Sequence, residues 1–421
     1  MKIGVIGAGV AGCCAALQVV RSGASCLLVE KNGLPGGTLS MGGVALPGLF
    51  HAWGGRQVIA GIGWELVQEA VALAGGKLPD FTKFEMNHHW LTQVPVNPVL
   101  FSALCDQKFQ AMGVDVRYHT MLGKVEPRQP GWELTLCGKD GLYSETVDFL
   151  IDCTGDANAV KMASYPIVEP EVCQPGTYSV HCTGYSLETV DWDALRTAFE
   201  AAEQRGEIQP GDVGWAKGFA KLFVNRYGEN ANHIPFVNRP SKGRDSYTRI
   251  EVDARASLLR VYRFLKRQPG FEDLDIRFVG MECGVRESRV IVGETEVTEK
   301  DFLSGKVYPD AVCYGFYPVD LHDMEQGLIK RYPAEGVVPT VPRGALIPRG
   351  SRSLLAAGRI LASDRMANSG LRIQATCMAT GQAAGALAAL CVKTGATPQE
   401  LPQPLLREEL LRNGAILPPE V

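Results

Sequence analysis

The stretch MKIGVIGAGVAGCCAALQVVRSGASCLLVE, residues 1–30, decides the fold of this chain. It begins with an apolar run over residues 2–6 and ends with a second apolar run over residues 26–29. Between them, a glycine-rich turn leads into small and apolar residues that are typical of a buried helix, which Gly23 can end. This order predicts a strand, a turn, a helix and a second strand, the βαβ unit of doubly wound α/β folds.

Three glycines and one acid in this stretch fit a bound dinucleotide. Gly7, Gly9 and Gly12 have the spacing G-x-G-x-x-G. The first permits the tight turn, the second lets the backbone approach a pyrophosphate, and the third lets helix and strand pack closely. The helix N-terminus offers unpaired N–H groups to phosphate, and Glu30 is placed to accept hydrogen bonds from ribose hydroxyls. A phosphate-free turn would need few of these features, so the pattern predicts dinucleotide binding.

Later motifs indicate which dinucleotide is bound. Gly36 and Gly37 provide a second close backbone approach just after the second strand, which FAD proteins need more often than NAD proteins. The segment FLIDCTGDANAV, residues 149–160, has the form of a strand that ends in Thr-Gly-Asp. The segment SLLAAGR, residues 353–359, precedes a helix rich in Gly and Ala that includes residues 381–390. The glycine pair favours FAD, and the two later segments resemble segments of FAD-binding proteins.

On these motifs the chain resembles the FAD-dependent oxidoreductases with a glutathione-reductase-type fold, which are related to fumarate-reductase flavoproteins. The resemblance runs from Met1 to about Val392. It implies an α/β fold with a discontinuous Rossmann-type FAD-binding domain and an inserted α+β substrate domain. The expected parts are residues 1–165 and 336–421 for the FAD domain and residues 166–335 for the insertion. Helices are expected at 97–112, 193–204 and 251–267, and strands at 114–118, 178–182 and 277–281.

The resemblance also implies the contacts with the cofactor. The residues expected to bind FAD are Gly7, Gly9, Ala11, Gly12, Glu30, Lys31, Gly36, Gly37, Thr38, Val125, Thr154, Gly155, Gly358, Arg359, Gly370, Leu371, Arg372 and Ile373. Ser369 is expected to cap the long apolar helix, whose N-terminal amides would face the pyrimidine edge of the flavin. Gly358 and Arg359 stand where many disulfide reductases have Gly-Asp, which leaves Asp364 as a nearby candidate for the ribityl chain.

The segment HAWGG, residues 51–55, raises the question of a covalent cofactor. Some fumarate-reductase relatives attach FAD through a histidine shortly before a glycine pair, and His51 is somewhat similar. Its spacing and surroundings differ from that pattern, so we expect a loop histidine and non-covalent FAD.

The segment GVRESRVIVGE, residues 284–294, places three charged residues beside an apolar run. A strand here would put Arg286 and Ser288 on one face and Glu287 and Arg289 on the other. The family has a similar run, and YGFYPVDLH downstream, which ends at His322, also looks family-like. We expect Arg286 to orient or polarise a substrate oxygen and His322 to donate or accept a proton. The alternative is an interdomain ion-pair network of Glu287, Arg289 and Asp320 without a catalytic role.

Composition narrows the remaining classes. A net charge of −4 and a pI of about 6.0 do not favour nucleic acids or an acidic membrane as partners. No two of the 12 cysteines have C-x-x-C spacing, so neither a metal site nor a redox dithiol is expected, and the cytoplasm is the expected compartment. Residues 375–392 are nearly apolar but rich in Ala and Gly, which suits a buried helix.

Two functional classes remain open. The first is an oxidoreductase that transfers hydride between a small organic substrate, bound between the domains, and N5 of the flavin. The second is a flavoprotein whose FAD is structural or regulatory. A third class, the modification of tRNA, is disfavoured by the acidic net charge. The substrate and the oligomeric state are not specified by the sequence.

Overall fold

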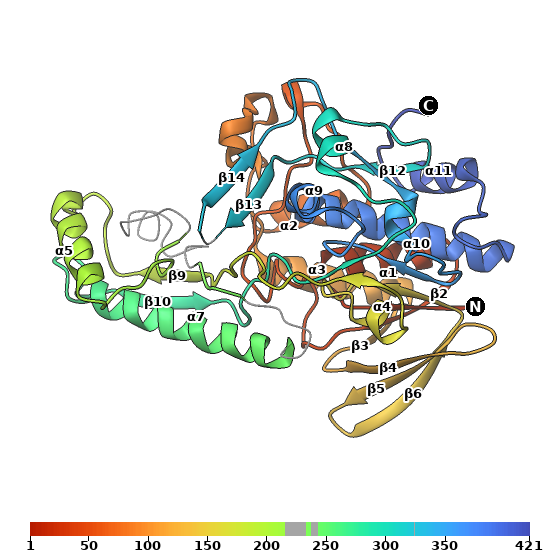
Figure 1. Cartoon of the computed structure of the whole chain (residues 1–421), viewed down its shortest axis with the longest axis horizontal. Coiled ribbons are helices and arrows are strands. Elements are labelled where there is room, and N and C mark those ends of the chain that lie inside the picture. Colours follow the sequence, from red (N-terminus) through yellow and green to blue (C-terminus); the bar gives the residue numbers. More distant parts are fainter. Residues whose placement is uncertain (215–232, 237–242, 324) are drawn as a thin grey trace.

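The computed structural model describes residues 1–214, 233–236, 243–323 and 325–421 (Figure 1). Its centre is a parallel sheet of five strands in the order β16-β7-β1-β2-β3. These strands are β1 (Lys2–Ile6), β2 (Ser25–Val29), β3 (Asp115–Arg117), β7 (Phe149–Asp152) and β16 (Leu354–Ala356). The α/β fold class expected from the sequence is therefore confirmed, and two of the expected strands, at 2–6 and 149–152, are neighbours in the sheet.

The parallel strands bring distant motifs to one edge of the sheet. β1, β2, β7 and β16 run in the same direction, so their carboxyl ends lie together. The phosphate-type turn follows β1, Glu30 follows β2, Thr154 follows β7 and Gly358 follows β16. Because ligands of open α/β sheets bind outside these carboxyl ends, the expected cofactor residues occupy the edge where a dinucleotide would lie.

Two helices pack directly against each other on this sheet. α1 (Val10–Arg21) crosses α10 (Gln374–Thr394) at very short range (Figure 1). A Cβ on Gly381 would lie 2.1 Å from the carbonyl oxygen of Ala11, and one on Gly385 would lie 2.5 Å from that of Ala15. The glycines of α10 are therefore required by the crossing. α10 is long and apolar enough to cross a membrane by length and composition, but it is largely buried inside the protein.

The helices expected from periodicity and capping are present. α3 (Pro98–Met112) begins after Asn97, whose side chain accepts from the N–H groups of Val99 and Leu100. α5 (Trp192–Gln204) matches the expected 193–204 within one residue. α7 (Gly243–Leu265) begins eight residues earlier than expected. Its first turns are polar and lack the apolar periodicity from which a helix is predicted.

Smaller antiparallel sheets surround the central one. The three-stranded sheet β4-β5-β6 follows β3, and β13 and β14 form a hairpin beside α9. The other bounds are α2 (Ile62–Leu73), α4 (Asn158–Met162), α8 (Glu299–Ser304), α9 (Arg365–Leu371), α11 (Gln403–Arg412), β4 (Met121–Pro127), β5 (Trp132–Gly138), β6 (Gly141–Val147), β8 (Ile167–Val168), β9 (Val180–Thr183), β10 (Asp275–Val279), β11 (Val290–Ile291), β12 (Ala311–Tyr314), β13 (Val319–Asp323), β14 (Gly327–Arg331) and β15 (Thr340–Pro342). Short 3₁₀ helices lie at Trp53–Gly55, Phe81–Lys83, Met86–Thr92 and Arg343–Leu346.

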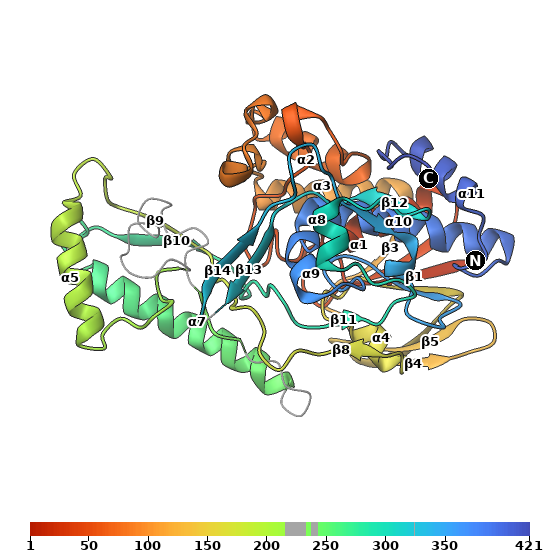
Figure 2. The same cartoon turned by 45° about the horizontal axis from the view of Figure 1, so that its top comes forward.

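The buried apolar residues form two clusters. The larger one contains the central sheet with α1, α2, α3 and α10. The second cluster takes its members from Cys173 to Cys283 and includes residues of α5, α7, β9 and β10. These elements form an arm that projects from the body of the protein (Figures 1 and 2). The domain boundaries at 165 and 335 stay a prediction.

Candidate functional site

The glycine turn after β1 is shaped by contacts that exclude side chains at two positions and leave space at the third. Gly7 has a φ of +95°, and a Cβ there would lie 2.5 Å from the carbonyl oxygen of Cys153. A Cβ on Gly12 would lie 1.8 Å from the carbonyl oxygen of Gly7. A Cβ on Gly9 would meet nothing within 4 Å among the described residues. The open side of this turn, at the start of α1, fits a bound pyrophosphate.

Glu30 is held beside this turn. Its Oε2 accepts from the N–H of Ala8 at 2.7 Å, and its Oε1 accepts from the N–H of Asn32 at 2.9 Å. Burial raises the pKa of Glu30, and the two backbone hydrogen bonds oppose that shift. Each carboxylate oxygen has a second lone pair, so the side chain can still accept a ribose hydroxyl.

The second glycine pair packs onto the first. The N–H of Gly36 donates to the carbonyl oxygen of Ala8 at 2.7 Å, and Gly36 also forms a bridge with Gly9. A Cβ on Gly37 would lie 2.9 Å from the Cα of Gly9. Residues 36–37 therefore form one wall of the turn. The carbonyl oxygen of Thr38, next in the chain, accepts from the N–H of Val44.

The remaining expected contacts on the nucleotide side have their own structural partners. Lys31 forms an exposed ion pair with Glu282. Val125 is buried in β4 opposite Leu134. Ala11 lies in the first turn of α1, where it also contacts α10 through the close approach of Gly381. These positions are compatible with the expected roles, which stay predictions.

The strand ends at β7 and β16 meet through one ion pair. Arg359 donates from Nη2 to Oδ1 of Asp156 at 3.0 Å. Gly155 lies under this guanidinium, with a φ of +74°, and a Cβ there would lie 2.9 Å from Cζ of Arg359. The Thr154 hydroxyl donates to Asp152 at 2.7 Å, and Gly358 has a φ of +85°. Arg359 is thus positioned by Asp156 rather than free to turn.

The junction between α9 and α10 differs from the expectation for Ser369. Asp364 caps α9, accepting from the N–H of Ala367 at 2.8 Å, and Ser369 lies inside that helix. Ser369 accepts from the N–H of Asp320 instead. The prediction that Ser369 caps the long helix was wrong, because the chain forms a separate short helix first. α10 begins after Ile373 without a side-chain cap, so its first N–H groups remain available to an acceptor. The expected residues Gly370, Leu371, Arg372 and Ile373 form this junction.

The segment GVRESRVIVGE is a regular strand only at β11, so the strand predicted over residues 286–289 was wrong. Instead, the side chain of each of these residues makes its own hydrogen bond or ion pair. Arg286 donates to the carbonyl oxygen of Pro175 at 2.6 Å, Ser288 donates to Asp156 at 2.6 Å and Arg289 pairs with Glu169 at 2.7 Å. Glu287 pairs with Arg365. Glu287, Arg289 and Asp320 therefore have separate partners in place of the single network that was the alternative.

Two arginines lie close together at the centre of the site. Burial and the neighbouring charge of Arg372 lower the pKa of Arg286 to about 10. Burial also lowers the pKa of Arg372, and the charge of Asp320 opposes that shift. Arg372 donates to the backbone oxygen of Asp320 at 3.1 Å and to Oε1 of Gln174 at 3.4 Å. Its Nε is buried without a partner among the described residues, as is Nε2 of Gln174.

The predicted residue His322 lies in a chain of three titratable groups beside these arginines. Its Nε2 is 3.0 Å from Oδ2 of Asp320, and its Nδ1 is 2.9 Å from Nε2 of His233. Burial, helped by the charge of Arg286, lowers the pKa of His322 to about 4. Burial acts the other way on Asp320, but the hydrogen bond from His322 holds its pKa below the ordinary value. The structure therefore brings both residues predicted to be catalytic into one site.

A second hydrogen-bonded pair at the site was missed by the sequence reasoning. Nε2 of His89 is 2.9 Å from the hydroxyl of Tyr317, and Nδ1 of His89 is 3.0 Å from the carbonyl oxygen of Met86. Burial lowers the pKa of Arg286, Arg372 and His89. Tyr317 opposes the shift of both arginines, and Asp320 opposes that of His89. Tyr317 belongs to the quoted segment YGFYPVDLH, but nothing near His89 in the sequence signals this pairing.

His51 lies in an aromatic cluster. Its ring stacks on Phe81 with centroids 3.7 Å apart and packs edge-on against Trp64. Burial lowers the pKa of His51 to about 4. The ring of His51 therefore has a packing role in this cluster. The expectation of non-covalent FAD stays a prediction.

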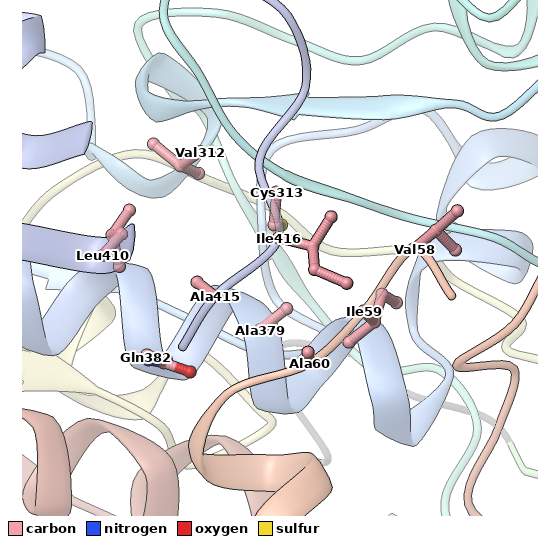
Figure 3. Close-up of a pocket in the computed structure, with 10 residues that line it drawn as sticks. All are labelled: Val58, Ile59, Ala60, Val312, Cys313, Ala379, Gln382, Leu410, Ala415 and Ile416. Carbon is pink, nitrogen blue, oxygen red and sulfur yellow. The ribbon is translucent and has the colours of Figure 1, made fainter. Parts of the chain in front are cut away.

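A small cavity lies away from these residues, where the C-terminal segment crosses α10 (Figure 3). Ala415 and Ile416 face Ala379 and residues 58–60 across it. Its volume of about 10 Å³ has room for about one water molecule, too little for a substrate.

The sequence and the structure were compared with protein families and with solved structures. The model of a family described as FAD dependent oxidoreductase matches residues 3–410. Solved structures that match this chain include a geranylgeranyl bacteriochlorophyll reductase-like protein from Thermoplasma acidophilum, with 11% identity, a TM-score of 0.44 and coverage of 99% of this chain and 84% of that one. Another is the p-nitrophenol 4-monooxygenase PnpA from Pseudomonas putida DLL-E4, with 11% identity, a TM-score of 0.42 and coverage of 98% and 84%.

A third similar structure is the anhydrotetracycline hydroxylase OxyS from Streptomyces rimosus, with 14% identity, a TM-score of 0.42 and coverage of 98% of this chain. The chain spans 66% of the length of that protein. No curated protein matches this sequence. The family model covers nearly the whole chain, and the phosphate turn, Glu30 and the open face of Gly9 fit its cofactor. The chain therefore belongs to the FAD-dependent oxidoreductase family, whose cofactor is FAD.

Proposed function

We propose that this oxidoreductase transfers hydride between a carbon of a small organic anion and the flavin, with the anion held by Arg286 and Arg372. The observation that carries the proposal is the proximity of these two partly buried guanidinium groups to the junction of α9 and α10. When bound, FAD supplies a hydride donor or acceptor at N5. Membership of the FAD-dependent oxidoreductase family supports an enzyme that turns over a substrate, rather than a protein in which FAD has only a structural role.

The charges of the site favour an anionic substrate. Arg286 and Arg372 bring two positive charges, and Asp320 brings one negative charge. Glu287 is already paired with Arg365. The two arginines carry more positive charge than Asp320 balances. Burial is the main cause that lowers the pKa of both, and a bound negative charge would oppose that shift. A carboxylate would supply that charge and accept from Nε of Arg372, which has no partner among the described residues.

Each residue of the site then has a defined role. Arg286 orients the oxygen of the substrate, and its bond to the carbonyl oxygen of Pro175 fixes the guanidinium. Gln174 fixes Arg372 and also accepts from the N–H of His322 at 3.1 Å. Both ring nitrogens of His322 face protein groups, so a proton that His322 exchanges passes through Asp320 or His233. His322 is therefore proposed as the middle member of a proton path.

The test is an anaerobic screen for bleaching of the flavin absorbance. The holoenzyme is mixed with glycolate, D- and L-lactate and L-malate, and each acid is compared with its neutral methyl ester. After photoreduction, reoxidation by fumarate and pyruvate tests the opposite direction. We expect at least one acid to react and its ester to react at least about 100-fold more slowly, because the ester cannot pair with both arginines. Equal rates for acid and ester would overturn the anionic substrate.

A further inference from the structure

We propose that Tyr317 is a catalytic residue that exchanges the proton of the substrate's oxygen and that His89 is the base behind it. This inference rests on the proposed hydride transfer and adds the proton that must accompany it. It concerns two residues that come from segments more than 200 positions apart.

The hydrogen bonds of His89 fix which nitrogen carries its proton. A carbonyl oxygen only accepts, so Nδ1 of His89 must donate to Met86. Nε2 of the neutral ring is then an acceptor, and the hydroxyl of Tyr317 must donate to it at 2.9 Å. Burial lowers the pKa of His89, so the ring is neutral near pH 7 and keeps this acceptor free for the phenol. The phenol oxygen keeps lone pairs that can accept a second proton.

The position of Tyr317 places it at the reaction site. Tyr317 lies in the turn between β12 and β13, one residue after Phe316 and two after Gly315. A Cβ on Gly315 would lie 2.6 Å from Leu371, and one on Gly370 would lie 3.2 Å from the carbonyl oxygen of Pro318. The turn therefore packs on the α9–α10 junction, where the flavin is expected. Burial lowers the pKa of Arg286 and of Arg372, and the nearby phenol opposes both shifts.

The proton step balances with the hydride step. With FAD bound, the oxidation of a hydroxy acid would pass the C–H electron pair and its hydrogen as hydride to the oxidised flavin. The O–H bond breaks, its proton goes to the phenol oxygen of Tyr317, and the phenol's own proton moves to Nε2 of His89. The substrate becomes a carbonyl compound and His89 becomes an imidazolium. The nearby charge of Asp320 raises the pKa of His89 and so favours that cation, whereas Lys330 disfavours it.

His322 cannot accept the proton of the substrate's oxygen directly. Its two nitrogens are occupied by Asp320 and His233, whereas Tyr317 reaches its base in one hydrogen bond. The proposed function predicts slow flavin reduction in Arg286→Ala. This inference predicts slow flavin reduction in Tyr317→Phe as well.

The experiment has one arm that needs no substrate. In the ¹⁵N-histidine spectrum of the holoenzyme, His89 should carry its proton on Nδ1, and Tyr317→Phe should shift Nε2 because its donor is lost. A proton on Nε2 of His89 would overturn the proposal whether or not any compound in the screen reacts.

The second arm measures anaerobic flavin reduction by the fastest acid of the screen. Tyr317→Phe should slow reduction at least about 100-fold, the usual scale for a general acid–base group. The matched control is Tyr308→Phe, which removes a buried hydroxyl bonded to Asp301 elsewhere and should leave the rate unchanged. His89→Gln should move the acidic limb of the rate profile from below neutral pH toward the phenol range near pH ~10. The control His88→Gln changes an exposed neighbour bonded to Glu85 and should keep the wild-type profile.

A normal rate in Tyr317→Phe together with a slow Arg286→Ala would refute this inference and leave the proposed function standing. Normal rates in both variants would refute the proposed function as well. A wild-type enzyme that reacts with none of the acids would remove the proposed substrate class, and the spectroscopic arm would still decide the pairing of Tyr317 with His89.

Discussion

Arg365 and Glu287 form a two-point ion pair, in which Nε donates to Oε1 at 2.8 Å and Nη2 donates to Oε2 at 3.0 Å. Glu287 is buried and also accepts from the N–H of Gln174 at 2.7 Å. This pair explains why a carboxylate stands in an otherwise apolar segment. Glu287 fastens residues 284–289 to α9 and to Gln174, so its neighbour Arg286 is directed toward Arg372 and His322.

Removal of Glu287 should destabilise the fold. Glu287→Ala leaves the N–H of Gln174 and part of Arg365 without an acceptor, so we expect a loss of about 1–3 kcal/mol in the free energy of unfolding. Urea unfolding measures this loss. The control Glu126→Ala removes an exposed pair with Lys124 and should cost less than about 1 kcal/mol. Equal losses in the two variants would show that burial gives Glu287 no special role.

Gly9→Val should separate cofactor binding from folding. A Cβ at Gly9 meets no described atom within 4 Å and its φ of −63° suits any residue, so the protein should fold. The added side chain would occupy the space assigned to the pyrophosphate, and the protein should purify without FAD. Gly12→Val, by contrast, places a Cβ 1.8 Å from the carbonyl oxygen of Gly7 and should not fold. Circular dichroism and the flavin absorbance are the readouts, and full FAD content in Gly9→Val would contradict the assignment of this turn.

The flavin should be bound without a covalent bond. Acid denaturation followed by filtration is expected to release all yellow colour, because His51 is explained by its stack on Phe81. His51→Ala should retain FAD. Colour that stays with the polypeptide in the wild type and leaves it in His51→Ala would show that this expectation is wrong.

Arg286→Ala and His322→Ala should affect catalysis more than stability. Both variants are expected to keep FAD, and Arg286→Ala should slow anaerobic flavin reduction by the reactive acid at least about 100-fold. His322→Ala interrupts the chain from Asp320 to His233 and should slow the same step. A fall in melting temperature with an unchanged rate per folded molecule would assign both residues a structural role.

Stability should decrease as pH falls from about 6.5 toward 4. The pKa of His51 is about 4 in the folded protein against 6.5 as its ordinary value, so the unfolded chain binds the proton first in this window. Unfolding then takes up protons, and its free energy falls with decreasing pH by up to ~1.4 kcal/mol per pH unit for each such group. His51→Phe keeps the ring stack and removes one titrating group, so urea unfolding at several pH values should give a shallower slope. An unchanged slope would mean that His51 titrates normally.

The sequence by itself determined the cofactor half of this protein. The turn at Gly7, Gly9 and Gly12, the acid at Glu30 and the Asn97 cap depend on backbone geometry within a few residues, and parallel pairing then places the strand ends together. The short helix α9 was not predicted, because no apolar periodicity marks it in the sequence. Asp364 caps α9, and Ser369 lies inside this helix and not at the cap of α10.

Only the tertiary structure decided the composition of the site. Gln174, Arg286, Tyr317 and His89 come from four distant segments, and their hydrogen bonds depend on how α9, β13 and residues 86–92 pack together. The alternation of a strand assigned faces to residues 286–289, but side-chain hydrogen bonds to Pro175, Asp156, Glu169 and Arg365 replaced the strand. Such pairings follow from three-dimensional proximity, because the desolvation of a charge is offset by whichever partner the packing brings within reach.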